Sequence, residues 1–188
     1  MREGLVVSAG GGQVGEPLYR AAVAAHDLNW PALALPTTIV AGPFAPPGVV
    51  ADLQAAAARR DGLTIVPHVP NLGPLLMGAR ASVSQCGYNT ALDLLRTAVP
   101  ALVVPYAEGR ENEQTRRAER LADRQLLRML PAADLDGARL AAAIRELLHF
   151  SPSGAALQMN GAQATLDLLA ARAEAWGRRR EACAETAP

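Results

Sequence analysis

One stretch of the chain combines a glycine turn with small polar side chains and an acidic residue. It runs from Ser84 to Asp93 and contains Gly87, Asn89 and Thr90. The pattern indicates the end of a strand, a tight turn that Gly87 allows without a Cβ clash, and the first turn of a helix. Backbone N–H groups at a helix N-terminus favour a phosphate, to which Asn89 and Thr90 can also donate. Asp93 would reach a ribose attached to that phosphate.

Each of these residues also has an ordinary structural interpretation. Asn89 and Thr90 are common helix-capping residues, and Asp93 can be a solvated helix residue. We favour a nucleotide site because the residues occur together at this spacing.

A second glycine-rich segment, Ser8–Gly15, follows an apolar run and precedes a helical run. Its three consecutive glycines let the backbone adopt positive φ or approach a ligand closely. We predict that Gly11 and Gly12 face the same diphosphate, because both segments follow strands of one sheet. A tight strand-to-helix turn is the alternative, and the spacing is not that of the Rossmann dinucleotide fingerprint.

Two shorter features complete the candidate site. Glu113 and Gln114 can take paired hydrogen bonds from sugar hydroxyls, with a charged helix start as the alternative. The loop with His68 and Val69 is either a proline-stiffened turn or a loop whose backbone reads a nucleobase edge. The three histidines are scattered, so we predict no metal site and identify no catalytic residue in this chain.

Apolar runs rich in β-forming residues alternate with alanine- and leucine-rich helical runs. Short continuous apolar strands in repeated strand–helix units predict an α/β fold with a Rossmann-like, doubly wound parallel sheet of about six strands. The expected strands span residues 4–8, 37–41, 63–66, 81–84, 101–104 and 126–130. The expected helices span residues 16–25, 49–60, 72–79, 89–96, 111–123 and 135–148.

The predicted domain organisation has two parts. Residues 1–150 form the Rossmann-like, nucleotide-sugar-binding domain, and residues 151–188 form a C-terminal helix and tail. The chain breaks at Ser151–Gly154, continues as one long helix over residues 155–180, and ends in residues 181–188, which read as frayed.

Composition narrows the function classes. The 18 basic residues are all arginine and balance 18 acidic residues, so a neutral domain of this kind has no electrostatic case for binding nucleic acid. No apolar run approaches a membrane span, and the N-terminus lacks a signal-peptide pattern. Cys86 and Cys183 make no disulfide framework, which favours the reducing cytoplasm.

The signature around Gly87 resembles that of GT-B glycosyltransferases. The shared features are the run Cys86–Thr90, the acidic Asp93, the prolines Pro100 and Pro105, and the acidic–Gln pair at 113–114. The chain is similar to the C-terminal, donor-binding half of the family-28 type, which includes the bacterial N-acetylglucosaminyltransferase of peptidoglycan lipid synthesis.

The resemblance implies one half of a GT-B fold that holds a UDP-sugar without a metal or other cofactor. It assigns the residues as follows: Gly11, Gly12, Gly87, Asn89 and Thr90 to the diphosphate, Asp93 to the ribose, Glu113 and Gln114 to the sugar, and His68 and Val69 to the base. The catalytic base belongs to an N-terminal acceptor domain, which would act in cis or as a separate subunit.

Three residues depart from the family pattern. Gln85 stands where plant-type relatives carry a histidine on the phosphate, Asp93 replaces the usual glutamate, and Arg117 stands where asparagine is common.

The expected function is donor binding in a hexosyl- or N-acetylhexosaminyltransferase. The alternatives are half of a nucleotide-sugar epimerase, which the lack of an acid/base pair opposes, and a noncatalytic nucleotide-binding module. The expected partners are the UDP-sugar and the acceptor domain, with homo-oligomers and peripheral membrane association through that domain left open. The expected location is the bacterial cytoplasm, extending to the inner face of the membrane.

Overall fold

The computed structural model describes residues 2–107, 112–153, 163, 165–173 and 176. The chain divides into two compact units, Met1–Gly154 and Ala155–Pro188. The first unit carries the sheet and every predicted site residue, so the following description concerns that unit unless the second is named.

The first unit is built on one six-stranded sheet in the order β3-β2-β1-β4-β5-β6, and all of its neighbouring strands are parallel. The strands are β1 (Leu5–Ser8), β2 (Thr37–Val40), β3 (Leu63–Val66), β4 (Ala81–Ser84), β5 (Ala101–Val103) and β6 (Arg128–Met129). This arrangement confirms the predicted fold class, because the order is that of a doubly wound Rossmann-like sheet.

Helices follow the strands in alternation. They are α1 (Glu16–Leu33), α2 (Pro47–Ala57), α3 (Gly73–Gly78), α4 (Tyr88–Thr97), α5 (Glu113–Asp123) and α6 (Gly137–Leu147), with a short 3₁₀ helix at Ala132–Asp134. In the described part of the chain, no helix is both long and apolar enough to cross a bilayer.

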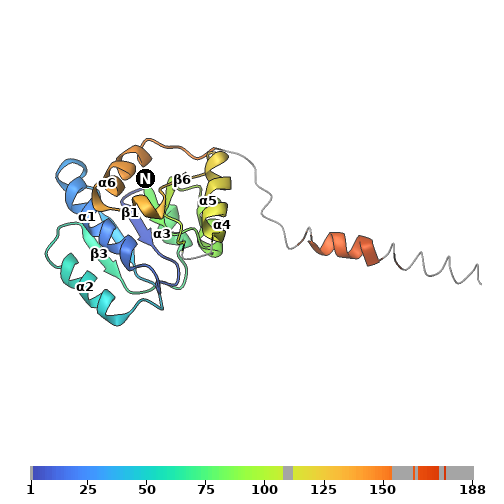
Figure 1. The fold of residues 1–188 in the computed structure, drawn as a ribbon, viewed down its shortest axis with the longest axis horizontal. Coiled ribbons are helices and arrows are strands. Elements are labelled where there is room, and N and C mark those ends of the chain that lie inside the picture. Colours follow the sequence, from blue (N-terminus) through green and yellow to red (C-terminus); the bar gives the residue numbers. More distant parts are fainter. Residues whose placement is uncertain (1, 108–111, 154–162, 164, 174–175, 177–188) are drawn as a thin grey trace, which may run out of the picture. The chain divides into compact units, whose positions relative to one another are not determined.

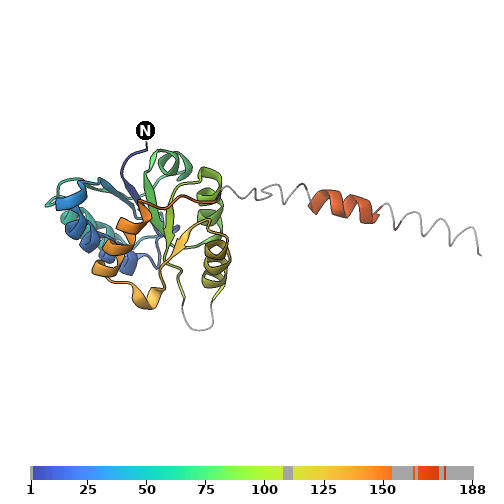
Figure 2. The ribbon, with the colours of Figure 1, turned by 90° about the horizontal axis from the view of Figure 1, so that it is seen from above.

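The helices cover both faces of the sheet (Figures 1 and 2). Each face has its own apolar core. Residues alternate between the two faces along a strand. In β1, Leu5 and Val7 pack with α1, α2 and α6, whereas Val6 packs with α3, α4 and α5. Burial on both faces explains why the strands read as continuous apolar runs rather than alternating ones.

Helix α1 is longer than predicted. It was expected to end at residue 25 but continues to Leu33, with Pro31 inside its last turns. Tertiary contacts hold the extension, because the Nδ2 of the buried Asn29 donates to the Ala141 carbonyl and His26 lies 3.1 Å from the Thr37 hydroxyl. His26 is therefore a structural residue, because it is buried and its ring nitrogens lie within hydrogen-bond distance of the Thr37 hydroxyl and the Asp61 carbonyl.

The centre of the sheet is a topological switch point. From β1 the chain proceeds to β2, and from β4 it proceeds to β5 in the opposite direction, although β1 and β4 are hydrogen-bonded neighbours. In open parallel sheets, ligands bind outside the carboxyl ends of the strands at such a point. The loops after β1 and β4 are the two glycine segments that the sequence singled out.

The second unit is helical at residues 163, 165–173 and 176. Its side-chain amide at Gln163 donates to Asp167, one turn further on, at 2.9 Å. The predicted helix over residues 155–180 is thus seen in its described part. The predicted frayed end over residues 181–188 lies outside the described residues.

Gly42 supports the base of the first glycine segment, and its replacement tests that packing. Its φ is +94°, and a Cβ there would lie 2.5 Å from the Gly10 carbonyl oxygen. Gly42→Ala should lower the free energy of unfolding by roughly 1–3 kcal/mol in urea titrations. The control Gly48→Ala has open space around its Cβ and should not destabilise. Equal stability of the two variants would contradict this packing.

Candidate functional site

Hydrogen bonds join the two glycine segments at the carboxyl edge of the sheet. The backbone N–H of Gln85 donates to the Ser8 carbonyl at 3.2 Å, and the Gln85 side-chain nitrogen donates to the Val14 carbonyl at 3.1 Å. A Cβ on Gly10 would lie 3.7 Å from the Thr90 hydroxyl oxygen, so the glycine loop (Ala9–Gly15) closely approaches the start of α4.

The N-terminus of α4 is the second half of the candidate site. The helix begins at Tyr88 after an N-cap at Gly87, and no side chain among the described residues caps it. Asn89 is exposed and Thr90 is 7% exposed. The capping interpretation of these two residues is therefore wrong for this structure. The first backbone N–H groups of α4 are therefore not capped by a described side chain, which is the condition for an anion site at a helix N-terminus.

Gly87 does not have the structural role that the sequence predicted. Its φ of −60° suits any residue, and the nearest heavy atom to an added Cβ is the Thr90 hydroxyl at 4.0 Å. The expectation that a Cβ would crowd the turn itself is wrong. By contrast, Gly12 is required by the fold, since its φ is +87° and a Cβ would lie 2.0 Å from the Ala41 oxygen. Gly11 is exposed beside the Phe44 ring.

Asp93 lies one turn along α4 from these groups. Its side chain is 29% exposed, and its Oδ1 is 3.9 Å from an Arg96 nitrogen. The carboxylate is thus accessible and only loosely paired, as a hydrogen-bond acceptor for a ligand hydroxyl needs to be. Its role at a ribose stays a prediction.

Side chains from the first turns of α5 form hydrogen bonds with Cys86, the residue that precedes Gly87. Gln114 Oε1 accepts hydrogen bonds from the backbone N–H groups of Cys86, at 3.0 Å, and Tyr106, at 3.2 Å. Arg117 donates to the Cys86 carbonyl at 2.7 Å and forms an ion pair with Glu113. The Gln114 oxygen is thus committed to the backbone, and a contact between this residue and a sugar stays a prediction.

Sequence reasoning missed this bracing of Cys86. Cys86 and Arg117 are 31 positions apart, and no local pattern signals a contact over that separation. Gln85 is likewise a structural residue here, because it is 8% exposed and its side chain ties the glycine loop to β4.

The predicted base loop lies apart from these residues along the same edge of the sheet. His68 and Val69 follow β3, three strands from β4, which corresponds to about 14 Å at the usual strand spacing. The loop is joined to the one after β2, where the Gly42 N–H donates to the Pro67 carbonyl at 2.9 Å. A nucleotide would have to lie along this edge of the sheet to contact both the loop after β3 and the turn after β4.

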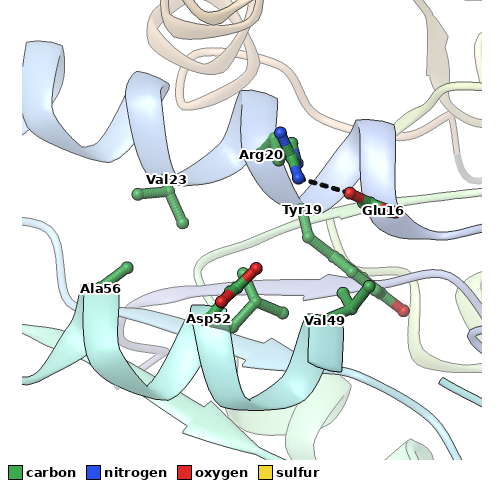
Figure 3. Close-up of a pocket in the computed structure, with 8 residues that line it drawn as sticks. Glu16, Tyr19, Arg20, Val23, Val49, Asp52 and Ala56 are labelled. Atoms are coloured by element: carbon green, nitrogen blue, oxygen red, sulfur yellow. Dashed lines mark ion pairs between the residues drawn. The ribbon is translucent and has the colours of Figure 1, made fainter. Parts of the chain in front are cut away.

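Two cavities lie near the glycine loop. One, of about 230 Å³, is lined by residues that follow β1, β4 and β5, among them Val14, Gln85 and Tyr106. The other, of about 300 Å³, is a groove between α1 and α2, where Val23 and Tyr19 face Val49 and Asp52 (Figure 3). The groove contains none of the predicted site residues.

In the described part of the chain, no cluster of three or more His, Cys, Asp or Glu side chains forms a possible set of metal ligands. Cys86 is a free, fully buried thiol. Cys183 lies outside the described residues.

A family model decides how the chain is classified. The model for the glycosyltransferase family 28 C-terminal domain matches residues 49–172, which include the Gly87 turn, α4 and α5. The chain belongs to this family. The match confirms the resemblance inferred from the Cys86–Thr90 run and the residues that follow it.

Individual relatives agree with the family. The UDP-N-acetylglucosamine--N-acetylmuramyl-(pentapeptide) pyrophosphoryl-undecaprenol N-acetylglucosamine transferase of Desulforamulus reducens is 30% identical over 87 residues, or 46% of this chain and 23% of that protein. MurG of Acinetobacter baumannii superposes with a TM-score of 0.71 at 22% identity, over 89% of this chain and 52% of that one. The chain therefore spans about half the length of such relatives, or less.

Epimerases share the same fold. The UDP-GlcNAc 2-epimerase of Neisseria meningitidis has a TM-score of 0.55 at 9% identity, over 79% of this chain and 36% of that one. At this identity the likeness concerns the fold alone, whereas the family model concerns the sequence and favours the transferase interpretation.

The buried position of Cys86 predicts an unreactive thiol. Burial raises the pKa of the thiol to about 11, although the positive charge of Arg117 lowers it. Because the thiolate is the reactive form, iodoacetamide at pH 8 should alkylate Cys86 far more slowly in the native chain than in urea. Peptide mass spectrometry measures both rates. Native labelling as fast as denatured labelling would contradict the described packing.

Proposed function

We propose that this chain is the donor-binding half of a glycosyltransferase that uses a UDP-sugar. The observation that carries the proposal is the meeting of two anion-binding features at the switch point. The glycine loop and the uncapped N-terminus of α4 approach each other there, in a chain that belongs to the family-28 C-terminal domains.

The proposed diphosphate position lies between these two features. Gly11 and Gly12 would approach it from β1, and Gly87, Asn89 and Thr90 from α4. The open space beside Gly87 supports this assignment, because neither backbone conformation nor a protein neighbour requires glycine there. A ligand that occupies this space would require the absence of a side chain.

The remaining contacts follow from the order of the elements. Asp93 would accept hydrogen bonds from ribose hydroxyls, and His68 and Val69 would contact the base at the β3 end of the edge. Glu113 and the Gln114 amide nitrogen would contact the sugar, since α5 braces the same turn. The leaving diphosphate would be stabilised by fixed N–H groups and the α4 dipole, which need no reorganisation during the reaction.

Transfer itself needs a second half. The proposed acceptor domain, in cis or as a separate subunit, would supply the acceptor and the catalytic base and would exclude water from the cleft. The names of the curated relatives describe transfer of N-acetylglucosamine to a lipid-linked pyrophosphate acceptor. We extend to this chain a hexosyl or N-acetylhexosaminyl donor, a bacterial cytoplasmic location and a membrane-associated partner.

Replacement of Gly87 by serine tests the proposed diphosphate position. Serine is a preferred N-cap residue, so its hydroxyl should accept a hydrogen bond from one of the free α4 N–H groups and leave stability unchanged or slightly raised. The same hydroxyl would fill the space of the phosphate, and UDP affinity should fall at least about tenfold in calorimetry.

The matched control is Gly48→Ser on α2, where an added Cβ meets no other atom and UDP affinity should be unchanged. If wild-type protein binds UDP and Gly87→Ser binds it equally well, the phosphate lies elsewhere. If wild-type protein binds neither UDP nor UDP-sugars, the proposed function is wrong.

Replacement of Asp93 separates the ribose from the phosphates. Asp93→Ala should weaken UDP binding by roughly 1–3 kcal/mol, the range for a lost hydrogen bond to a charged group, and should leave pyrophosphate binding nearly unchanged. Asp52→Ala, an exposed carboxylate on α2, controls for the loss of one negative charge. Equal weakening of UDP and pyrophosphate would mean that Asp93 supports the turn and not the ribose.

A further inference from the structure

The conformation of the Gly87 turn (Cys86–Tyr88) is not imposed by Gly87. Its φ is −60° and ψ is 158°, an extended conformation open to any residue, and beyond the two adjacent residues the nearest atom to an added Cβ is the Thr90 hydroxyl oxygen at 4.0 Å. The residues on either side must therefore fix the direction in which the first N–H groups of α4 point.

Side chains of α5 hold Cys86, the residue before Gly87, by hydrogen bonds to its backbone N–H and to its backbone carbonyl. The Cys86 N–H donates to Gln114 Oε1 at 3.0 Å, and the Cys86 carbonyl accepts from Arg117 Nη1 at 2.7 Å. Cys86 is fully buried, so these polar groups have no access to water in place of the side chains. Loss of either partner would leave a buried backbone group unpaired.

Arg117 also reaches the residue that follows Gly87. Its guanidinium carbon lies 5.7 Å from the centre of the Tyr88 ring, a cation–π distance. One side chain thus contacts both neighbours of Gly87. Its second terminal nitrogen is held by the Glu113 carboxylate, and the Arg117 side chain is only 20% exposed.

We propose that Arg117 is a positioning residue that sets the Gly87 turn so that the α4 N–H groups converge on the donor diphosphate. The inference rests on the proposed function for the identity of the ligand. It makes α5 a structural part of the phosphate site as well as a proposed source of sugar contacts.

The chemistry of arginine suits this task better than that of its usual substitutes. The planar guanidinium can donate from separate nitrogens to the Cys86 carbonyl and the Glu113 carboxylate while its face meets an aromatic ring. Lysine has one nitrogen and no plane, so it would retain only part of these contacts. Asparagine is too short to span the same distance from α5.

The test compares Arg117→Met, Arg117→Lys and a matched control, Arg116→Met. Arg116 is the exposed neighbour on α5, and its replacement removes the same charge without touching Cys86. Calorimetry with UDP, pyrophosphate and uridine measures binding, and amide hydrogen exchange of the ligand-free chain measures the turn at the Cys86 and Ala91 N–H groups. The Ala91 N–H bonds to the Gly87 carbonyl at 2.9 Å and so reports the same turn.

We expect Arg117→Met to lower UDP and pyrophosphate affinity by roughly tenfold or more, to leave uridine binding unchanged and to speed exchange at both amides. Arg117→Lys should recover part of the loss, and Arg116→Met should match the wild type. The Arg117→Lys variant also keeps the inference testable if the Arg117→Met variant does not fold.

Three results would overturn the inference. Wild-type affinity in Arg117→Met would remove the role, and equal losses in the Arg117→Met and Arg116→Met variants would leave only a general charge effect. A loss of affinity with unchanged exchange would mean that Arg117 acts on the ligand directly. If wild-type protein binds no UDP, the proposed function fails, and the exchange measurement alone decides whether Arg117 fixes the turn.

Discussion

The in-register pairing of β1 with β4 is the constraint on which the remainder of the first unit depends. Leu5 pairs with Ala81 and Ser8 with Ser84, so the two strands end level at the same edge. A slip of one residue would reverse which side chains face each apolar core. The loops that follow these two strands therefore start side by side. Segments about 75 residues apart in sequence are brought together in this way to form the candidate site.

The packing of α1 places the end of the glycine loop directly against the apolar core. Alanines on α1 and α6 allow the two helices to approach closely, and Asn29 links them by bonding to the Ala141 carbonyl and accepting from Arg145. At the other end of α1, the fully buried Tyr19 donates its hydroxyl hydrogen bond to the Ala41 carbonyl at 2.5 Å. A Cβ on Gly15 would collide with that ring, so the loop is shaped by the core beneath it.

Sequence reasoning located the strands well because their burial on both faces produces short apolar runs between breakers. Residues 63–66 and 81–84 were predicted with the observed bounds, whereas β6 is shorter than predicted and spans Arg128–Met129, which pair with Leu102 and Val103 of β5. The end of α1 was predicted too early. Asn29 forms a hydrogen bond with Ala141, far away in sequence, which stabilises the last turns of the helix despite the presence of Pro31. The candidate site residues were predicted from their types and their spacing in the sequence. The hydrogen bonds of Gln114 and Arg117 to Cys86 could not be predicted in this way, because they depend on proximity in three dimensions.

The strand order also has a consequence for how the chain folds. β1 is synthesised first yet lies in the middle of the sheet, so β2 and β3 extend one side of it before β4 is made. Until β4 arrives, the open edge of β1 exposes unpaired backbone groups to other chains. The family-matched segment, residues 49–172, contains β3, β4, β5 and β6. It lacks β1 and β2, the two strands that lie between β3 and β4 in the sheet. A polypeptide trimmed to that segment would leave β3 without a neighbour, so a shorter version that keeps the whole sheet has to include β1 and β2.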